Sequence, residues 1–302
     1  MNIDAGKIET KIENFIRQMF DNFQRDGVIL GVSGGVDSAL VATLLTRALG
    51  PDKVLALLLP ERDSSPDSKT DALKVINRLG IDYREVDIEP VLTAMGIYKL
   101  VPLNILGARK IKETVVKQQH NSQSKLLGEM PFQAGLLGTR HLGKTKQLIN
   151  AGNAYARAKH RARIMTLYYY ADLENRLVAG TTNKSESMTG FVVKWGDNVA
   201  DIEPILPLYK TQVWQLSSYL GVEQEIIDKT PSPDLMPGIV DEIALGIDYL
   251  TLDKILFSLA QNWESGQIEA AYGVTADQVD HVKEMAQRSW HLRELPPYPE
   301  LF

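Results

Sequence analysis

The chain has 302 residues, of which 44% are hydrophobic and 24% charged, and it contains no cysteine. This composition is typical of a globular protein with a core, and the lack of cysteine excludes disulfides, thiolate zinc sites, iron–sulfur clusters and a cysteine nucleophile. The first ten residues lack the apolar core of a secretory signal. The longest apolar stretch, residues 54–59, is far shorter than the ~20 residues of a membrane span. We therefore expect a cytoplasmic protein with no membrane partner.

The first ninety residues alternate between helical and strand patterns. Residues 4–25 carry apolar side chains at helical spacing and predict an amphipathic helix. The segments that follow predict, in chain order, a buried strand at 28–32, a helix at 38–49, a buried strand at 54–59, a helix at 68–79 and a strand at 83–88. Units of this length are typical of an α/β fold with an open, mainly parallel sheet and helices on both faces.

The stretch at about 95–156 interrupts this alternation. It is rich in Lys, Gln, Asn and Gly and shows weak periodicity, which predicts a mobile insertion or lid rather than another α/β unit. The pattern resumes with a helix at 157–171 and a strand at 177–180, and residues 241–302 predict a helical C-terminal region with a proline-rich end. Because no repeat or linker is visible, we expect a single domain over 1–302 that contains one long basic insertion.

Charge is distributed unevenly along the chain. The formal net charge is −5, but Lys99–Arg163 holds 13 Lys and Arg against two acidic residues, a net charge of +11, which leaves −16 for the remainder. An anionic partner, such as a nucleotide, a nucleic acid or an acidic surface, would explain this asymmetry. A solvated basic loop that balances an acidic body would explain it equally well.

The string Gly31-Val32-Ser33-Gly34-Gly35-Val36-Asp37-Ser38 lies between the first predicted strand and the next helix. Its glycines allow a sharp turn and a close approach to a ligand, and N–H groups at the start of a helix suit a phosphate. Asp37 fits such a site if it holds Mg²⁺ against the phosphates. The string is neither a Walker A loop nor a Rossmann glycine motif.

A second cluster of polar residues follows the strand predicted at 177–180. Glu186 is a candidate second metal ligand facing Asp37, and Lys210, which opens a predicted helix, is a candidate phosphate contact. Alone, each would be an ordinary cap or loop residue, but they belong to an ordered set: Gly180–Glu186, Gly190–Phe191, Lys194–Asp197, Asp201–Pro204, Leu208–Val213, Pro231–Leu235, Pro237–Gly238 and Asp241–Glu242. The histidines show no metal-ligand spacing and are expected to be solvated, namely His120, His141, His160 and His281.

The Ser33–Ser38 string resembles the signature of the ATP pyrophosphatase (PP-loop) superfamily, and the ordered set resembles the ammonia-dependent NAD⁺ synthetases. The likeness spans about Val28–Ser68 and Arg157–Leu252, with a weaker match at His291–Pro297. It implies an adenine nucleotide alpha hydrolase-like fold, a homodimer, and a ligase that joins deamido-NAD⁺ and ammonia, through an acyl-adenylate, into NAD⁺ with release of AMP and pyrophosphate. ATP is the implied co-substrate and Mg²⁺ the implied cofactor.

The resemblance also implies roles for single residues. Asp37 and Glu186 would be catalytic and would bind Mg²⁺. ATP would contact Gly31, Val32, Ser33, Gly34, Gly35, Val36, Asp37, Ser38, Thr181, Lys210 and Ser232. Deamido-NAD⁺ would contact Arg161, Lys194, Asp201 and His291. The chain departs from the family pattern in its long basic insertion and in Leu292, which stands where the family tends to have lysine.

Two other functions compete with this interpretation. A PP-loop enzyme of the lysidine type would modify tRNA with the basic insertion gripping RNA, but the pI near 5.6 argues against a nucleic-acid partner. An adenine-nucleotide sensor without catalysis would not need both candidate carboxylates. Relatives that obtain ammonia from glutamine use a cysteine nucleophile, so we expect ammonia itself to be the nitrogen source.

Overall fold

The computed structural model describes residues 1–103 and 107–300. At its centre lies a parallel sheet of four strands in the order β3-β2-β1-β4, with bounds β1 (Gly27–Gly31), β2 (Val54–Leu58), β3 (Asp82–Glu85) and β4 (Arg176–Val178). In the register, Ile29 lies beside Leu55 on one side and Val178 on the other. The carboxyl ends of β1, β2 and β4 therefore meet at one edge of the sheet, where open α/β sheets bind ligands.

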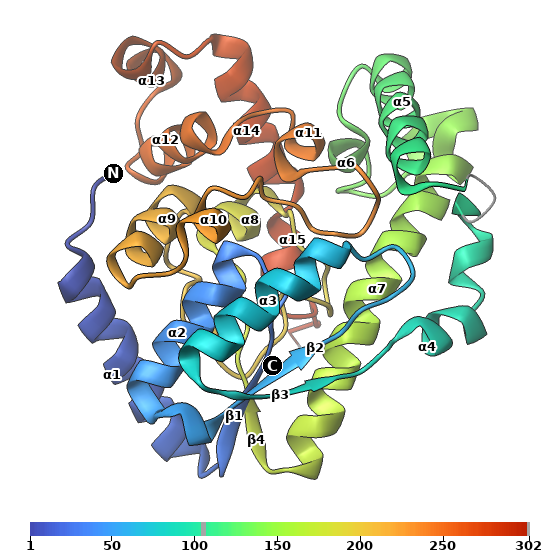
Figure 1. Cartoon of the computed structure of the whole chain (residues 1–302). Coiled ribbons are helices and arrows are strands. Elements are labelled where there is room, and N and C mark those ends of the chain that lie inside the picture. Colours follow the sequence, from blue (N-terminus) through green and yellow to red (C-terminus); the bar gives the residue numbers. More distant parts are fainter. Residues whose placement is uncertain (104–106, 301–302) are drawn as a thin grey trace.

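Helices cover both faces of this sheet. The described helices are α1 (Ala5–Phe23), α2 (Val36–Leu49), α3 (Pro66–Leu79), α4 (Glu89–Ala94), α5 (Arg109–Leu127), α6 (Pro131–Ala134), α7 (Lys146–Leu173), α8 (Lys184–Thr189), α9 (Lys210–Tyr219), α10 (Gln224–Ile227), α11 (Asp241–Leu245), α12 (Tyr249–Ala260), α13 (Ser265–Tyr272), α14 (Ala276–Arg288) and α15 (Trp290–Arg293). Short 3₁₀ turns stand at Pro51–Lys53, Ile97–Lys99 and Arg140–Thr145. The helix α7 crosses the sheet on the side opposite to α2 and α3 (Figure 1).

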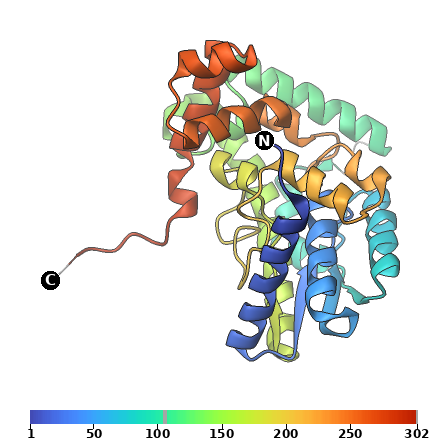
Figure 2. The ribbon, with the colours of Figure 1, turned by 90° about the vertical axis from the view of Figure 1, so that its left-hand side faces the viewer.

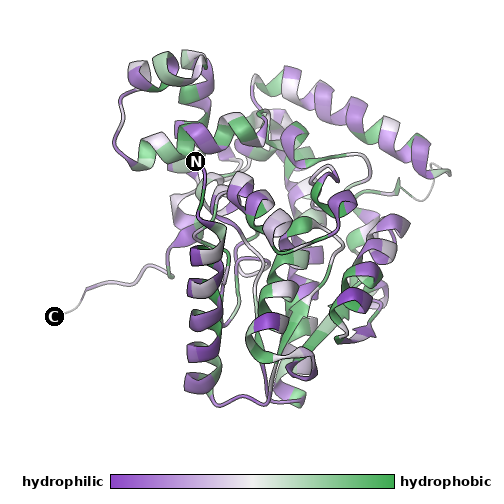
Figure 3. Cartoon of the chain, turned by 60° about the vertical axis from the view of Figure 1, so that its left-hand side comes forward, coloured by the Kyte–Doolittle hydropathy of each residue, from purple (hydrophilic) through white to green (hydrophobic). Residues whose placement is uncertain are grey.

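Alternate residues of the strands build two separate cores. Val28 and Leu30 of β1 pack with apolar residues of α1, α2, α3 and α9, whereas Ile29 packs with Leu167 and Ala171 of α7. Because both faces are buried, the strands consist of nearly continuous apolar runs instead of alternating polar and apolar residues. Hydrophilic residues line the outward side of α1 and most of α5 (Figure 3).

The C-terminal helices form a third core of their own. Apolar residues of α11 to α14 pack together and onto α8 and α9, with Tyr249, Ile255, Ile268 and Val282 fully buried. Beyond α15 the chain is exposed and runs away from the body of the protein (Figure 2). No helix in the described part of the chain is both long and apolar enough to cross a membrane.

These observations confirm the α/β class, the parallel sheet, the four strands and the helical C-terminal region. Within the stretch expected to be a mobile insertion, residues 109–127 form the helix α5, and the helix expected at 157–171 already begins at Lys146. Only Val116 of α5 is buried and the rest of the helix is half-buried or exposed, so its sequence carries no clear apolar period. The structure does not describe residues 104–106 of this stretch.

Candidate functional site

The loop between β1 and α2 carries the glycine-serine string. Gly34 adopts a positive φ of 75°, and a Cβ there would lie 2.4 Å from the Ser68 backbone oxygen, so only glycine fits. Ser38 Oγ accepts a hydrogen bond from the Ser33 N–H at 3.2 Å and donates one to the Gly35 oxygen at 3.0 Å. The loop is thereby held in a tight turn at the N-terminus of α2, where the helix dipole favours an anion.

This loop forms the floor of a cavity of about 510 Å³ at the carboxyl edge of the sheet. Among the residues to which the sequence assigned ATP contacts, the cavity is lined by Gly31, Val32, Ser33, Gly35, Val36, Asp37, Ser38, Thr181, Lys210 and Ser232. Gly34 does not line it, because its Cα faces α3. Ser232 Oγ donates to the Ile239 oxygen at 3.2 Å, within the loop that follows α10.

Lys210, Asp37 and Glu186 meet in this cavity although they come from three helices. Lys210 Nζ lies 2.5 Å from Asp37 Oδ2 and 3.5 Å from Glu186 Oε1. Asn183 caps α8, donates from Nδ2 to Asp37 Oδ1 at 2.9 Å, and forms a capping box with Glu186. Each charged group therefore stands in the first turn of a helix, where its position is fixed by backbone contacts.

Burial and neighbouring charges shift the titration of this group. Burial raises the pKa of Glu186, and the nearby charge of Asp37 acts in the same direction, while Lys210 opposes both. Burial works to lower the pKa of Lys210, but the charges of Asp37 and Glu186 outweigh it and raise that pKa. The lysine is thus kept cationic at any physiological pH.

A buried aspartate that the sequence did not single out joins α8 to α9. Asp253 of α12 accepts hydrogen bonds from Ser185 Oγ at 2.5 Å and from the Thr211 N–H at 2.8 Å. Ser185 Oγ in turn accepts the Lys210 N–H at 2.9 Å. Asp253 is therefore a positioning residue, since it fixes the relative place of the two first turns that carry Glu186 and Lys210. No local motif marks it, because its partners lie more than 40 residues away.

A second buried pair lies beneath Lys210. Tyr249 donates to Asp241 Oδ2 at 2.8 Å, and the Lys210 ammonium lies 5.2 Å from the centroid of the Tyr249 ring. Burial raises the pKa of Asp241, and the charge of Lys210 opposes that rise. The sequence placed Asp241 in the ordered set but assigned no role to it.

The residues assigned to the dinucleotide lie outside the cavity lining. Three of them form one group: Arg161 donates from Nε and Nη2 to the Lys194 oxygen at 3.3 and 3.1 Å, and Lys194 Nζ donates to the His291 oxygen. Asp201 stands apart, since its carboxylate accepts the Val178 N–H at 2.8 Å and the Tyr168 hydroxyl at 3.1 Å. The structure thus brings Arg161, Lys194 and His291 together, whereas Asp201 is bound to Val178, the last residue of β4.

Two further buried groups adjoin the cavity. His160 lines it with Nδ1 3.4 Å from Asp197 Oδ2, so the expectation of a solvated His160 is wrong: α7 turns this side chain toward the sheet edge. Glu203 packs behind Gly180, where any Cβ would overlap its carboxylate. Neither oxygen of Glu203 has a hydrogen-bond partner among the described residues, and burial raises its pKa to about 8.

Part of the basic stretch faces the cavity. Arg109 and Lys117 of α5 and Arg163 of α7 line it, together with Lys69 and Lys229. A cavity with this many cations beside a glycine-serine loop suits a polyanion such as a nucleotide triphosphate. The parallel sheet, the loop at the helix N-terminus and the lysine-bridged carboxylates define the α/β nucleotide-binding class with a PP-loop.

The chain belongs to the NAD synthase family, whose model matches residues 8–126 and 129–296. It is 45% identical over 249 residues to an NH₃-dependent NAD⁺ synthetase of Thermotoga maritima, an alignment that covers 82% of this chain and 85% of the relative. Among solved structures, the NMN synthetase of Francisella tularensis has 28% identity and a TM-score of 0.72, covering 99% of this chain and 100% of that one. An NH₃-dependent NAD synthetase of Campylobacter jejuni has 27% identity and a TM-score of 0.69, with the same coverage.

Proposed function

We infer that this chain catalyses the ATP-dependent amidation of deamido-NAD⁺ with ammonia, which gives NAD⁺, AMP and pyrophosphate. The observation that carries this inference is the cluster of Asp37, Glu186 and Lys210 beside the Ser33–Ser38 loop, within a chain of the NAD synthase family. ATP is the co-substrate that this family uses. The tRNA-modifying alternative is not favoured, because the relatives are named for the synthesis of NAD⁺.

The reaction that we propose has two steps. A carboxylate oxygen of the nicotinate group forms a bond to the α-phosphorus of ATP, and pyrophosphate leaves with the electron pair of the broken P–O bond. The nitrogen of ammonia then attacks the carbonyl carbon of the acyl-adenylate, loses a proton and displaces AMP. In this proposal the Ser33–Ser38 loop and the Lys210 ammonium, which line the cavity, bind the phosphates and stabilise the charge that spreads over them.

Mg²⁺ fits the residues that are present. Asp37 and Glu186 offer hard carboxylate oxygens on two sides of the Lys210 ammonium, and this negative charge supports a cation site. No group of three or more metal-ligating side chains occurs in the part of the chain that the structure describes. Mg²⁺ is typically held by one or two carboxylates plus phosphates and water, and Asp37 and Glu186 supply two carboxylates. When bound, the ion would neutralise charge on the phosphates.

For deamido-NAD⁺ we propose contacts with Arg161, Lys194, Asp201 and His291. The cations of this set suit the diphosphate of the dinucleotide.

We further propose a homodimer. Met165, Tyr169 and Leu173 are more than half exposed at four-residue spacing along α7, opposite the side that covers the sheet, and such a stripe supports burial against a second copy. Light scattering tests this proposal, since a native chain that is monomeric at micromolar concentration would contradict it.

The enzymatic proposal is tested by a turnover assay. The pure chain is incubated with ATP, Mg²⁺, ammonium and deamido-NAD⁺, and NAD⁺ is detected with a coupled dehydrogenase while AMP is measured separately. Because one solved relative is an NMN synthetase, a second arm replaces deamido-NAD⁺ with nicotinate mononucleotide. We expect NAD⁺ and AMP in equal amounts. AMP release without NAD⁺, or a strong preference for the mononucleotide, would contradict deamido-NAD⁺ as the acceptor.

A further inference from the structure

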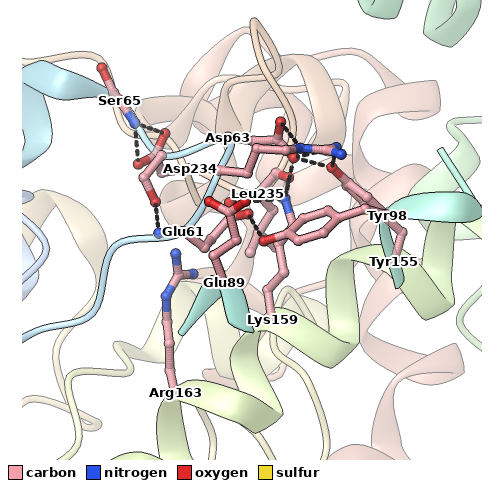
Figure 4. A network of polar contacts seen from close by, with 12 residues as sticks. Glu61, Asp63, Ser65, Glu89, Tyr98, Tyr155, Lys159, Arg163, Asp234 and Leu235 are labelled. Carbon is pink, nitrogen blue, oxygen red and sulfur yellow. Dashed lines mark hydrogen bonds and ion pairs between the residues drawn. The ribbon is translucent and has the colours of Figure 1, made fainter. Parts of the chain in front are cut away.

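The ammonium group of Lys159, on α7, is completely buried and uses all three of its N–H donors. It donates to Glu61 Oε1 and Asp63 Oδ2, both at 3.0 Å, and to the backbone oxygen of Leu235 at 2.8 Å (Figure 4). The two carboxylates are as fully buried as the lysine. An ammonium has three donors and no acceptor, so this side chain is completely satisfied by three acceptors from two separate loops.

A shell of polar side chains completes this cluster. Tyr98 donates to Glu61 Oε2 at 2.9 Å, and Arg62 bonds both carboxylate oxygens of Asp63 at 3.2 Å. Tyr155 also donates to Asp63. Two cations therefore balance two carboxylates inside the protein. Taking four charges out of water is costly, and apolar residues of similar volume often serve stability as well or better. We therefore look for a role of this cluster other than stabilising the fold.

Both loops that Lys159 joins are walls of the nucleotide cavity. Leu59, Pro60, Ser64 and Ser65 line it from residues 59–65, and residues 229–240 contribute Lys229 to Asp234 and Gly238 to Val240. Neither segment contains a helix or a strand. Their backbones consequently lack the hydrogen bonds of regular structure and depend on side chains for a fixed position.

The tips of the two loops are tied directly as well. Asp234 accepts the Ser65 N–H at 2.9 Å (Figure 4) and the Ser68 hydroxyl at 3.3 Å, and Arg109 at the start of α5 donates to the Ser64 oxygen at 3.0 Å. These outer contacts are partly exposed, whereas the Lys159 contacts with Glu61 and Asp63 are buried and its contact with the Leu235 oxygen is partly buried. The two loops are therefore joined twice, through the Lys159 ammonium and through the Asp234 carboxylate.

We propose that Lys159 is a positioning residue that joins residues 59–65 to residues 229–240 and thereby sets the shape of the cavity that binds ATP. This inference rests on the proposed function only for the identity of the nucleotide. Lys159 touches no substrate in this proposal and acts through the two loops. It also connects α7, which carries Arg161 and Arg163, to the walls of the ATP cavity.

The test uses the whole chain with Lys159→Met, which keeps the length of the side chain and removes its charge. The readouts are the dissociation constant for ATP in the presence of Mg²⁺, from calorimetry, and hydrogen exchange. We expect ATP binding to weaken by about tenfold or more, because the bound form must order two freed loops. Exchange should rise in both loops and stay unchanged in residues 31–38.

Ile268→Ala is the matched control. Ile268 is fully buried in the C-terminal core, so its truncation lowers stability without touching the cavity. We expect this variant to bind ATP within about twofold of the native chain. If Lys159→Met binds ATP as Ile268→Ala does, or if both loops keep their protection, Lys159 has only a structural role and the proposal is overturned.

A double variant keeps the proposal falsifiable if Lys159→Met alone does not fold. Lys159→Met with Glu61→Gln removes one positive and one negative charge and leaves Asp63 paired with Arg62. It lacks the bond to the Leu235 oxygen, so ATP binding should still weaken. Native affinity in the folded double variant would overturn the proposal. Normal, Lys159-dependent ATP binding in a chain that fails to amidate deamido-NAD⁺ would instead refute the proposed function alone.

Discussion

The buried carboxyl of Glu203 predicts a stability that falls as pH rises. Its pKa in the folded chain is about 8, against an ordinary value of 4.5, chiefly because burial penalises the charged form. Between these two pH values the folded chain keeps a proton on Glu203 that the unfolded chain has lost. Folding therefore binds a proton in this window, and the free energy of unfolding decreases with each pH unit. Glu203→Gln removes the titrating group and keeps the shape of the side chain.

The size of the effect follows from the same two values. Each pH unit within the window lowers the free energy of unfolding by about 1.4 kcal/mol. The rise from 4.5 to about 8 then corresponds to on the order of 5 kcal/mol, fully lost only above pH 8. Below pH 4.5 the glutamic acid is protonated in both states, so its titration contributes no further pH dependence. The difference between Glu203→Gln and the native chain should therefore grow with pH in favour of the variant.

Urea denaturation of both chains, followed by tryptophan fluorescence at pH 5, 6, 7 and 8 without ligands, measures this difference. All other titrating groups are shared by the two chains, so their contributions cancel when the variant is compared with the native protein. Asp248→Asn, at the exposed N-cap of α12, controls for the removal of a charge outside the core. If the difference in the free energy of unfolding between Glu203→Gln and the native chain stays constant from pH 5 to pH 8, the reasoning that Glu203 is a buried, unpaired carboxyl is refuted.

Four other outcomes are expected. Asp37→Asn and Glu186→Gln should keep the fold and lower turnover by about 10²-fold or more, because each removes charge beside the transferring phosphoryl group; near-normal turnover at saturating Mg²⁺ would show that the residue is not a metal ligand. Ammonium should support NAD⁺ formation and glutamine alone should not, since the chain has no cysteine; robust glutamine-dependent turnover by the pure chain would contradict this. Arg161→Ala should raise the KM for deamido-NAD⁺ more than the KM for ATP, and equal changes would remove Arg161 from the dinucleotide site. Asp253→Asn should lower kcat by disordering the first turns of α8 and α9; a drop in the thermal midpoint with unchanged kcat would assign Asp253 to the fold alone.

Features that depend on neighbours in the chain could be predicted from the sequence. The strand, the glycine-serine loop and α2 occupy consecutive residues, and the buried strands appear as apolar runs because both faces of a parallel sheet are covered. The C-terminal helices could also be predicted, because each buries one face and its apolar residues therefore recur at helical spacing. The helix α5 escaped prediction because only Val116 of its residues is buried, so its sequence lacks that period.

Contacts between distant segments were decided only by the tertiary structure. The motifs named Asp37, Glu186 and Lys210 as separate candidates, but the lysine lies between the two carboxylates only because the sheet brings the starts of three helices to one edge. Asp253, Glu203 and the Lys159 cluster have no local signature. The partners of Asp253 and Lys159 lie 42 to 98 positions away in the chain, and Glu203 is buried because it packs behind Gly180. Local sequence specifies which residues can bind or transfer charge. The desolvation and distances that determine what those residues do exist only once the chain has folded.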